Sequence, residues 1–349
     1  MIHKDFIIVG QGLAGTLLAH FLKEAGKHVV LLDREVGETA SQVAAGIINP
    51  VTGRRFVKSW MIETLLPFAK TTYRSLENLL NISIYHEKHI LRALSNPGQE
   101  NDWLARVVES GYAAYMAEKS NPGTYPQNLH PVYAFGETME SAQVDLKTLI
   151  EAYRAVFLAA GEYEVESFNY NAMRFSDGGV QYKNWSASGI IFCEGYGMKG
   201  NPYFNNLPMR GDKGQVLHVR IPQAGFEKMY KDQVFIVPFP NETYWIGATY
   251  EPRFEQEGPT AEGKDFLSAQ LTASLKLPFE IMAHKAAVRP TVKDRRPLLG
   301  TNPDFKQVHL FNGLGTKGAS LGPYWAHQMT EYLLGRSEID PLVDIRRFY

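Results

Sequence analysis

Short apolar runs and one helical stripe alternate along the first 34 residues in a pattern that is typical of a strand, a helix and a second strand. Residues 6–9 form an apolar run that suits a strand buried on both faces. Apolar residues then recur at helical spacing over residues 16–22, and Gly26 ends this helix. Residues 28–32 form a second apolar run, which Asp33 closes. The pattern predicts that the chain begins with a βαβ unit.

Three glycines stand between the first strand and the helix at the spacing G-x-G-x-x-G: Gly10, Gly12 and Gly15. The first makes a tight turn, the second lets the backbone approach a pyrophosphate, and the third brings the helix close to the strand. Asp33 follows Gly15 by 18 residues, near the spacing of roughly 20 at which an acid accepts a hydrogen bond from a ribose hydroxyl. An acid there favours a ribose without the 2′-phosphate of NADP. The unit predicts a dinucleotide site, with FAD and NAD both open, and its expected contacts are Gly10, Gly12, Leu13, Ala14, Gly15, Asp33 and Arg34.

The loop over residues 37–60 opens with small residues that would let the backbone press against a flat ring system. Serine and glutamine side chains in it could donate to the polar edge of such a ring. An ordinary surface loop is the competing interpretation. If the loop holds the cofactor, its contacts are expected at Ser41, Gln42, Ala45, Gly46 and Ile47.

The next part of the chain is predicted to form one long helix followed by short β-like segments. This helix is predicted over residues 62–80, where apolar residues form a stripe on one side. Residues 81–140 hold short β-like pieces separated by Asn-Pro-Gly turns at Asn96 and Asn121. This segment suggests a mixed cap.

Two later segments return the chain to the nucleotide domain, a helix over residues 146–160 and a buried strand within residues 189–195. Residues 214–290 are β-rich and are predicted to form an antiparallel sheet, with one helix within residues 259–277. The expected strands of this sheet are residues 215–220, 234–238, 244–250 and 284–288.

A second glycine turn occurs late in the chain. The apolar run at residues 308–311 is followed by Gly313, Gly315 and Gly318, and then by a helix that Gly335 ends. A plain NAD enzyme needs only one glycine-rich helix start. A second helix N-terminus could stabilise negative charge at the N1 and C2 carbonyl edge of a reduced flavin. The second turn therefore favours FAD over NAD.

Composition narrows the class of protein. The chain has 349 residues, 44% of them hydrophobic, which is enough for a large core and two domains. A formal net charge of −1 argues against a general nucleic-acid binder that relies on a basic field. The single cysteine, Cys193, excludes an internal disulfide and a cysteine-based metal cluster, and no metal site is expected. We see no leader peptide and no run of about 18 apolar residues, so we expect a cytoplasmic protein without membrane segments.

Four further motifs follow the opening unit in this order: RGDKGQV at residues 210–216, VPFPNETYWIGATYE at 237–251, VRPTVKDRRPLLG at 288–300 and NGLGTKGASLGP at 312–323. With them, nearly the whole chain resembles the D-amino acid oxidase and glycine oxidase family of FAD-dependent oxidoreductases. More faintly, it resembles the flavin domain of a bifunctional enzyme that modifies the wobble uridine of tRNA. The resemblance implies an α/β fold with two domains. They are a Rossmann-like FAD-binding domain from residues 1–80, 142–213 and 289–349, and an α+β substrate domain on an antiparallel sheet from residues 81–141 and 214–288.

The resemblance also assigns residues. Arg289 stands where glycine oxidase-like enzymes have an arginine that grips the substrate carboxylate, and a planar guanidinium matches a carboxylate bidentately. A structural pairing of Arg289 with Asp294 is the alternative. Phe235 stands where the glycine oxidase branch has a tyrosine, so a phenol able to bond the substrate is missing. The remaining cofactor contacts that the resemblance implies are Glu194, Gly195, Leu314, Gly315, Thr316, Lys317, Gly318 and Ala319.

The chemistry expected of such a protein is oxidation of the C–N bond of an amino acid or secondary amine. Hydride would leave Cα for flavin N5, water would hydrolyse the resulting imine, and O2 or another acceptor would take the electrons. Three alternatives stay open. They are a tRNA-modifying oxidase in which Arg54, Arg55 and Lys58 contact phosphate, an NAD-dependent dehydrogenase, and a flavin-bearing binding protein without turnover. The exact substrate, the electron acceptor and the oligomeric state, including a homo-oligomer, are not decided by the sequence.

Overall fold

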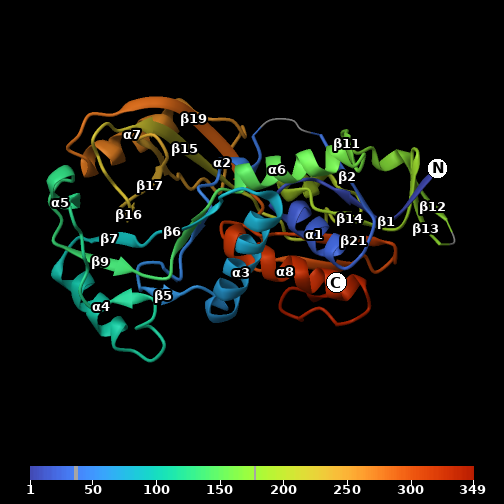
Figure 1. Ribbon diagram of the computed structural model, residues 1–349, viewed down its shortest axis with the longest axis horizontal. Coiled ribbons are helices and arrows are strands. Elements are labelled where there is room, and N and C mark those ends of the chain that lie inside the picture. The colour runs from blue at the N-terminus through green and yellow to red at the C-terminus, as the bar shows by residue number, and fades with distance from the viewer. Residues whose placement is uncertain (35–37, 177) are drawn as a thin grey trace.

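The computed structural model of the protein describes residues 1–34, 38–176 and 178–349. Two large sheets dominate it, and they lie toward opposite ends of the long axis of the molecule (Figure 1). Each sheet takes its strands from several separate stretches of the chain, so the polypeptide passes from one to the other more than once.

The first sheet has a parallel core in the order β11, β2, β1, β14 and β21. The bounds of these strands are β11 Tyr163–Val165, β2 Val29–Asp33, β1 Ile2–Val9, β14 Trp185–Phe192 and β21 Val308–Asn312. Three antiparallel strands extend it, namely β12 Met173–Ser176, β13 Gly179–Tyr182 and β20 Leu298–Thr301. The predicted βαβ start is confirmed, because β1 and β2 pair in parallel around helix α1, Leu13–Glu24.

Successive side chains of the central strands enter two different cores, as the period of two in a strand requires. Phe6 and Ile8 of β1 pack into a core with the helices α1, α3 Ile62–Leu80, α6 Leu146–Ala159 and α8 Gly318–Leu333. Ile7 and Val9 face the other core, which the β12–β13 hairpin and residues 198–209 complete. Both faces of the parallel strands are therefore buried, which explains their continuous apolar runs.

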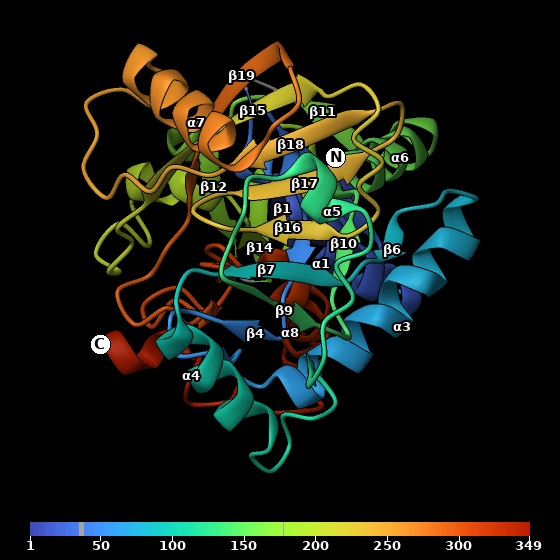
Figure 2. The same ribbon diagram turned by 90° about the vertical axis from the view of Figure 1, so that its left-hand side faces the viewer.

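The second sheet runs in the order β19, β15, β18, β17, β16, β7, β9 and β8, and Figure 2 shows most of these strands stacked one above another. Its strands are β19 Glu280–Arg289, β15 Asp212–Arg220, β18 Thr243–Gly247, β17 Phe235–Phe239, β16 Met229–Lys231, β7 Ile90–Leu94, β9 Ala134–Thr138 and β8 Met116–Ala117. Helix α7, Ala261–Ser274, packs Leu267 and Leu271 against one face. The opposite face packs against Val43 and Ala45 of the small-residue loop.

Shorter elements connect these layers. They are α2 Ala40–Val43, β3 Ile47–Ile48, β4 Val51–Thr52, β5 Val57–Lys58, β6 Tyr85–Glu87, α4 Pro97–Val107, α5 Tyr125–Asn128, β10 Ala142–Val144, and the 3-10 turns η1 Tyr170–Ala172, η2 Gly195–Gly200 and η3 Ile345–Phe348. Strands β3, β10 and β6 form a small sheet of their own.

The predicted elements agree with the structure in part. The helix predicted over residues 62–80 is confirmed at both ends. The turn predicted at Asn96 is wrong: the Asn96 side chain accepts from the backbone N–H of Gln99 and caps α4, in which Pro97 takes the first helical position. The second sheet is antiparallel except for one parallel pair, β16 with β7. The sequence also predicts a hairpin over residues 176–182 that turns at residues 177–179, and residue 177 of this turn lies outside the described residues.

Candidate active site

A cleft of about 960 Å³ is lined by residues of both large sheets. From the first sheet come the glycine turn, the end of β2, the loop after it, the end of β14 and the start of α8. From the second come residues of β15 to β19, including Phe235 and Arg289. Parallel strands of an open α/β sheet bind ligands at their carboxyl ends, and the cleft lies at that edge of the first sheet.

The glycine turn forms one wall of the cleft. Gly10 has a φ of +99°, and a Cβ on Gly15 would lie 1.9 Å from the carbonyl oxygen of Gly10. Only glycine therefore allows this turn and this approach of α1 to β1. Gly12, Leu13 and Ala14 line the cleft at the N-terminus of α1, where the first N–H groups of a helix have no partner within the helix.

Asp33 lies beside this turn at the end of β2. One of its carboxylate oxygens accepts from the backbone N–H of Gln11 at 2.8 Å, which fixes the side chain at the edge of the glycine turn. Arg34, the next residue, is exposed and also lines the cleft. Asp33 therefore lies next to the glycine turn, and its contact with a ribose hydroxyl stays a prediction.

The small-residue loop crosses the cleft between the two sheets. The Ser41 hydroxyl oxygen accepts from the backbone N–H of Leu13 at 3.1 Å and ties the loop to the start of α1. Gly46 has a φ of +71°, and a Cβ there would lie 1.8 Å from the carbonyl oxygen of Val144. The indole N–H of Trp245 donates to the carbonyl of Val43 at 2.8 Å, which links the loop to the second sheet.

Glu194 and Gly195 follow β14 and reach the cleft next to the glycine turn. The carboxylate of Glu194 accepts from the Tyr170 hydroxyl at 2.5 Å and from Nδ2 of Asn201 at 2.7 Å. Burial raises the pKa of Glu194, although these two hydrogen bonds act in the opposite direction. The preceding Cys193 is buried, and burial raises the pKa of its thiol well above the ordinary value.

The second glycine turn brings the N-terminus of α8 to the same cleft. Gly315 has a φ of +56° and its N–H donates to the carbonyl of Pro290 at 3.2 Å, so the turn lies directly against the end of β19. The hydroxyl of Tyr73 on α3 donates to the carbonyl of Ala319 at 2.9 Å and holds the first turn of α8 in place. Two separate helix N-termini, those of α1 and α8, therefore face one cleft.

Arg289 ends β19 on the cleft side, half-buried. Among the residues that the structure describes, the one hydrogen-bond acceptor for its two terminal nitrogens is the carbonyl oxygen of Thr249, at 3.4 and 3.5 Å. Burial lowers the pKa of Arg289, while the nearby Asp212, Tyr250 and Glu251 raise it. The structural pairing with Asp294 does not form, because Asp294 accepts from Nε of Arg347 at 2.9 Å.

Most of the residues that the sequence singled out meet in the cleft. Those that line it are Gly10, Gly12, Leu13, Ala14, Asp33, Arg34, Ser41, Ala45, Gly46, Ile47, Glu194, Gly195, Arg289, Leu314, Gly315, Thr316, Gly318 and Ala319. Three do not line it. Gly15 packs α1 against β1, Gln42 forms a capping box with Thr39 at the start of α2, and the ammonium of Lys317 donates to the Ser59 hydroxyl at 3.1 Å.

Sequence reasoning missed other lining residues. Gly214 and Lys231 belong to strands whose cleft-facing side is set by the register of the second sheet, which no local pattern announces. The cations Arg54, Arg55 and Lys58 are not among the lining residues, and Lys58 forms an ion pair with Glu63 instead.

Comparison with known proteins identifies the class. The family model described as FAD dependent oxidoreductase matches residues 5–332, and the chain belongs to that family. The match settles the cofactor as FAD, and the glycine cradle, the two helix N-termini and Asp33 fit such a dinucleotide. The protein is thus an FAD-dependent oxidoreductase, similar in fold to the glycine oxidase of Geobacillus kaustophilus. That structure has a TM-score of 0.81 and 20% identity, and the match covers 100% of this chain and 98% of the other.

Two curated relatives resemble the chain in sequence. The bifunctional protein ThiO/ThiG of Trichormus variabilis is 26% identical over 97% of this chain. The glycine oxidase of Pseudomonas aeruginosa is 25% identical over 97% of this chain and 96% of its own length. The chain spans 54% of the length of the ThiO/ThiG protein, so it matches about half of that relative.

In the part of the chain that the structure describes, no helix combines the length and the apolar character needed to cross a membrane. No group of three or more histidine, cysteine, aspartate or glutamate side chains in the same ranges is placed to hold a metal ion.

Proposed function

We propose that the protein oxidises the C–N bond of an amino acid or a secondary amine bearing a carboxylate to an imine, which water then hydrolyses. The observation that carries this proposal is the position of Arg289, a half-buried guanidinium in the cleft that holds the glycine turn. The similarity to a glycine oxidase over nearly the whole chain supports the same reaction class.

Arg289 is well suited to hold a carboxylate. Its two long contacts to Thr249 leave the planar fork of N–H groups largely available toward the cleft. A carboxylate that accepts two parallel N–H bonds is fixed in orientation as well as in position. The guanidinium would therefore hold the Cα–H and the nitrogen of the substrate in one orientation.

The cofactor residues would divide the dinucleotide between two helix ends. Gly10, Gly12 and Asp33 would hold the adenosine and pyrophosphate part at the start of α1. The start of α8, from Leu314 to Ala319, would face the flavin edge, where the positive end of the helix stabilises negative charge. Bound FAD supplies the acceptor for the hydride that leaves Cα. The chain itself contributes positioning, because the substrate reacts as the neutral amine and needs no base to remove a proton from its nitrogen.

The first experiment is an anaerobic screen of the FAD-loaded protein. Amino acids and N-alkylglycines are mixed with it, and the flavin absorbance is followed by stopped flow. We expect bleaching by at least one amine that carries a carboxylate, faster at higher pH until the amine is fully neutral. A flavin that no amine in the panel bleaches would contradict the proposal.

The second experiment changes Arg289. Replacement by alanine should lower kcat/KM for a carboxylate substrate by about a hundred- to a thousandfold, the range for losing one partner of a half-buried charge pair. Arg289→Lys should recover only part of this loss, because lysine lacks the fork. The control is Arg253→Ala, which removes an exposed arginine nearby and should have little effect. Equal turnover by Arg289→Ala would remove Arg289 from this role.

A further inference from the structure

Lys231 is a further cation of the cleft besides Arg289. It ends β16, lines the cleft with Phe235 and Arg289, and its ammonium lies 5.0 Å from the centre of the Phe235 ring. Its one hydrogen bond among the described residues goes to the carbonyl of Gln233, at 2.7 Å. Within the described ranges no carboxylate lies within 4.0 Å of this ammonium.

The register of the sheet places another cation, Arg92, next to Lys231 on the neighbouring strand. Lys231 pairs with Phe235 on one side and with Arg92 on the other, and register partners point their side chains to the same face. The guanidinium of Arg92 lies 4.7 Å from the centre of the Phe56 ring, and no acceptor for it is found among the described residues. Two like charges on neighbouring strands destabilise a sheet unless an anion lies between or beside them.

Burial and the neighbouring Arg92 lower the pKa of Lys231 to about 8, while Asp232 raises it. The group is therefore still charged over much of the neutral range, but its charge is not balanced by an ion pair in the described structure. A titratable group in a cleft whose pKa is shifted by burial and by a neighbouring charge is a candidate for a functional role.

The distance between Arg289 and Lys231 determines whether a single anionic group could contact both side chains. β19 and β16 are separated by four strand spacings, in the order β19, β15, β18, β17 and β16, which is about 19 Å across the sheet. One carboxylate cannot contact both Arg289 and Lys231 at that separation. Phe235, which stands where the related oxidases have a tyrosine, lies between them in the sheet order and offers no hydrogen bond of its own.

We infer that Lys231, supported by Arg92, forms a second anion subsite, and that the substrate is a dianion with one carboxylate at Arg289 and a second anionic group at Lys231. This inference rests on the proposed function and names the substrate class. The ligand is an extended molecule, an amino acid or secondary amine whose side chain or nitrogen substituent carries the second anionic group.

The test compares two series of substrates on the FAD-loaded protein. The first series is N-(carboxyalkyl)glycines of increasing chain length, and the second is N-alkylglycines of the same lengths. For each chain length, the rate of anaerobic flavin bleaching is measured and divided by the apparent Kd of the substrate. The value for the N-(carboxyalkyl)glycine is then divided by the value for the N-alkylglycine of the same length. We expect this ratio to reach about ten to a hundred at one chain length, as expected for one charge-assisted contact.

Variants locate the effect. Lys231→Met should bring the ratio close to one, Arg92→Met should lower it, and Lys231→Arg should retain most of it. The control Lys264→Met removes an exposed lysine on α7 and should keep the full ratio. Saturated dicarboxylic acids that cannot be oxidised provide a binding readout through the flavin spectrum. They should bind more tightly than monocarboxylic acids to the wild-type protein and to Lys264→Met, and this preference should be lost in Lys231→Met.

The outcomes separate the two proposals. Bleaching by both series with no preference, or a preference that survives in Lys231→Met, would overturn the second anion subsite and leave the proposed reaction intact. Bleaching by neither series would contradict the proposed function itself. If the dicarboxylic acids still bound more tightly to the wild-type protein than to Lys231→Met in that case, the anion subsite would stand without the amine chemistry.

Discussion

The guanidinium of Arg289 occupies the space that a side chain on Gly214 would fill. A Cβ on Gly214 would lie 2.0 Å from Nη2 and 2.3 Å from Cζ of Arg289. The two residues lie on the adjacent strands β15 and β19, where Gly214 pairs with Ala287 and Asp212 pairs with Arg289. The glycine is thus needed for the space it leaves open, and the position of the arginine depends on it.

Replacing Gly214 by alanine should displace Arg289 from the cleft. Gly214 does not have a positive φ, so the added methyl group acts on the guanidinium and adds no backbone strain. We expect KM for carboxylate substrates to rise about tenfold or more, since a displacement of about 1 Å in a binding group has effects of this size. Steady-state kinetics and a thermal melt would measure this. The control is Gly258→Ala, whose Cβ meets nothing within 4 Å. Unchanged KM in Gly214→Ala would mean that the carboxylate does not depend on this position of Arg289.

Removing the carboxylate of Asp33 should weaken cofactor binding. The structure places it beside the glycine turn, where it accepts from the N–H of Gln11. Asp33→Ala should raise the Kd of FAD by about ten- to a hundredfold, the range for losing a hydrogen bond to a charged group. Titration of the apoprotein with FAD, followed by flavin fluorescence, measures this. Asp265→Asn on the exposed side of α7 is the control, and equal FAD affinity in Asp33→Ala would separate Asp33 from the ribose.

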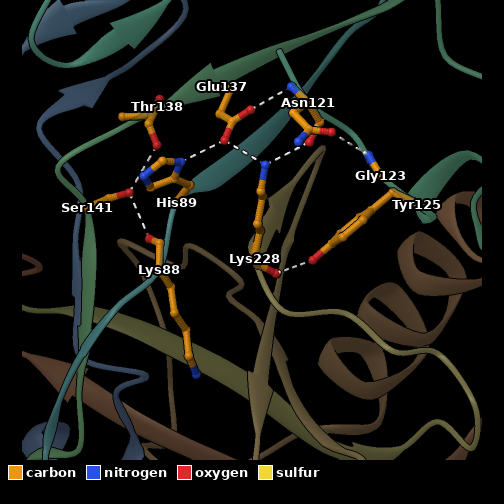
Figure 3. Close-up of polar contacts among 9 residues, drawn as sticks. All are labelled: Lys88, His89, Asn121, Gly123, Tyr125, Glu137, Thr138, Ser141 and Lys228. Carbon is orange, nitrogen blue, oxygen red and sulfur yellow. Dashed lines mark hydrogen bonds and ion pairs between the residues drawn. The ribbon is translucent and has the colours of Figure 1, made fainter.

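A buried carboxylate in the second sheet should make the fold sensitive to acid. Glu137 on β9 accepts from Nδ1 of His89, from the ammonium of Lys228 and from the N–H of Asn121, each at 2.7 Å, and Figure 3 shows these groups converging on it. Burial raises the pKa of Glu137, but the hydrogen bonds from Lys228, Asn121 and His89 outweigh it, and the pKa lies below the ordinary value of 4.5. The charged form is thus the form that the fold stabilises.

Glu137→Gln should lower the free energy of unfolding by about 3 kcal/mol at neutral pH. A carboxylate whose pKa is lowered by folding stabilises the protein fully above the unfolded pKa and loses this contribution as pH falls through the folded pKa. The stability difference between wild type and Glu137→Gln should therefore be largest near pH 7 and shrink below about pH 4.5. Urea unfolding at several pH values measures it, with the exposed Glu118→Gln as control. A difference that does not change with pH would argue that packing, not charge, explains the loss.

Local sequence was sufficient wherever a feature depends on neighbours in the chain. The βαβ unit follows from apolar runs, from a glycine turn and from Asp33, all within 34 residues, and α3 has the bounds that its apolar stripe predicts. Local pattern failed where one side chain had two uses. Asn96 was expected in a turn and instead caps α4.

The direction of a side chain also cannot be predicted from its position in a motif. Lys317 lies among residues that line the cleft, but its ammonium contacts Ser59, 258 residues away in sequence. The division of the chain into an FAD-binding and a substrate domain stays a prediction, and so do the roles of the individual cofactor contacts.

By itself, the sequence determined the dinucleotide-binding start and the second glycine turn, because each is encoded by a few residues that are close in the chain. The candidate arginine came from the resemblance of nearly the whole chain to a known family. Only the tertiary structure decided which residues share a sheet face with that arginine. Gly214, Phe235, Lys231 and Arg92 come to one face of one sheet through the long-range register of six strands, including the parallel pairing of β16 with β7. Such register depends on contacts between residues far apart in the chain, and no local period of apolar residues specifies it.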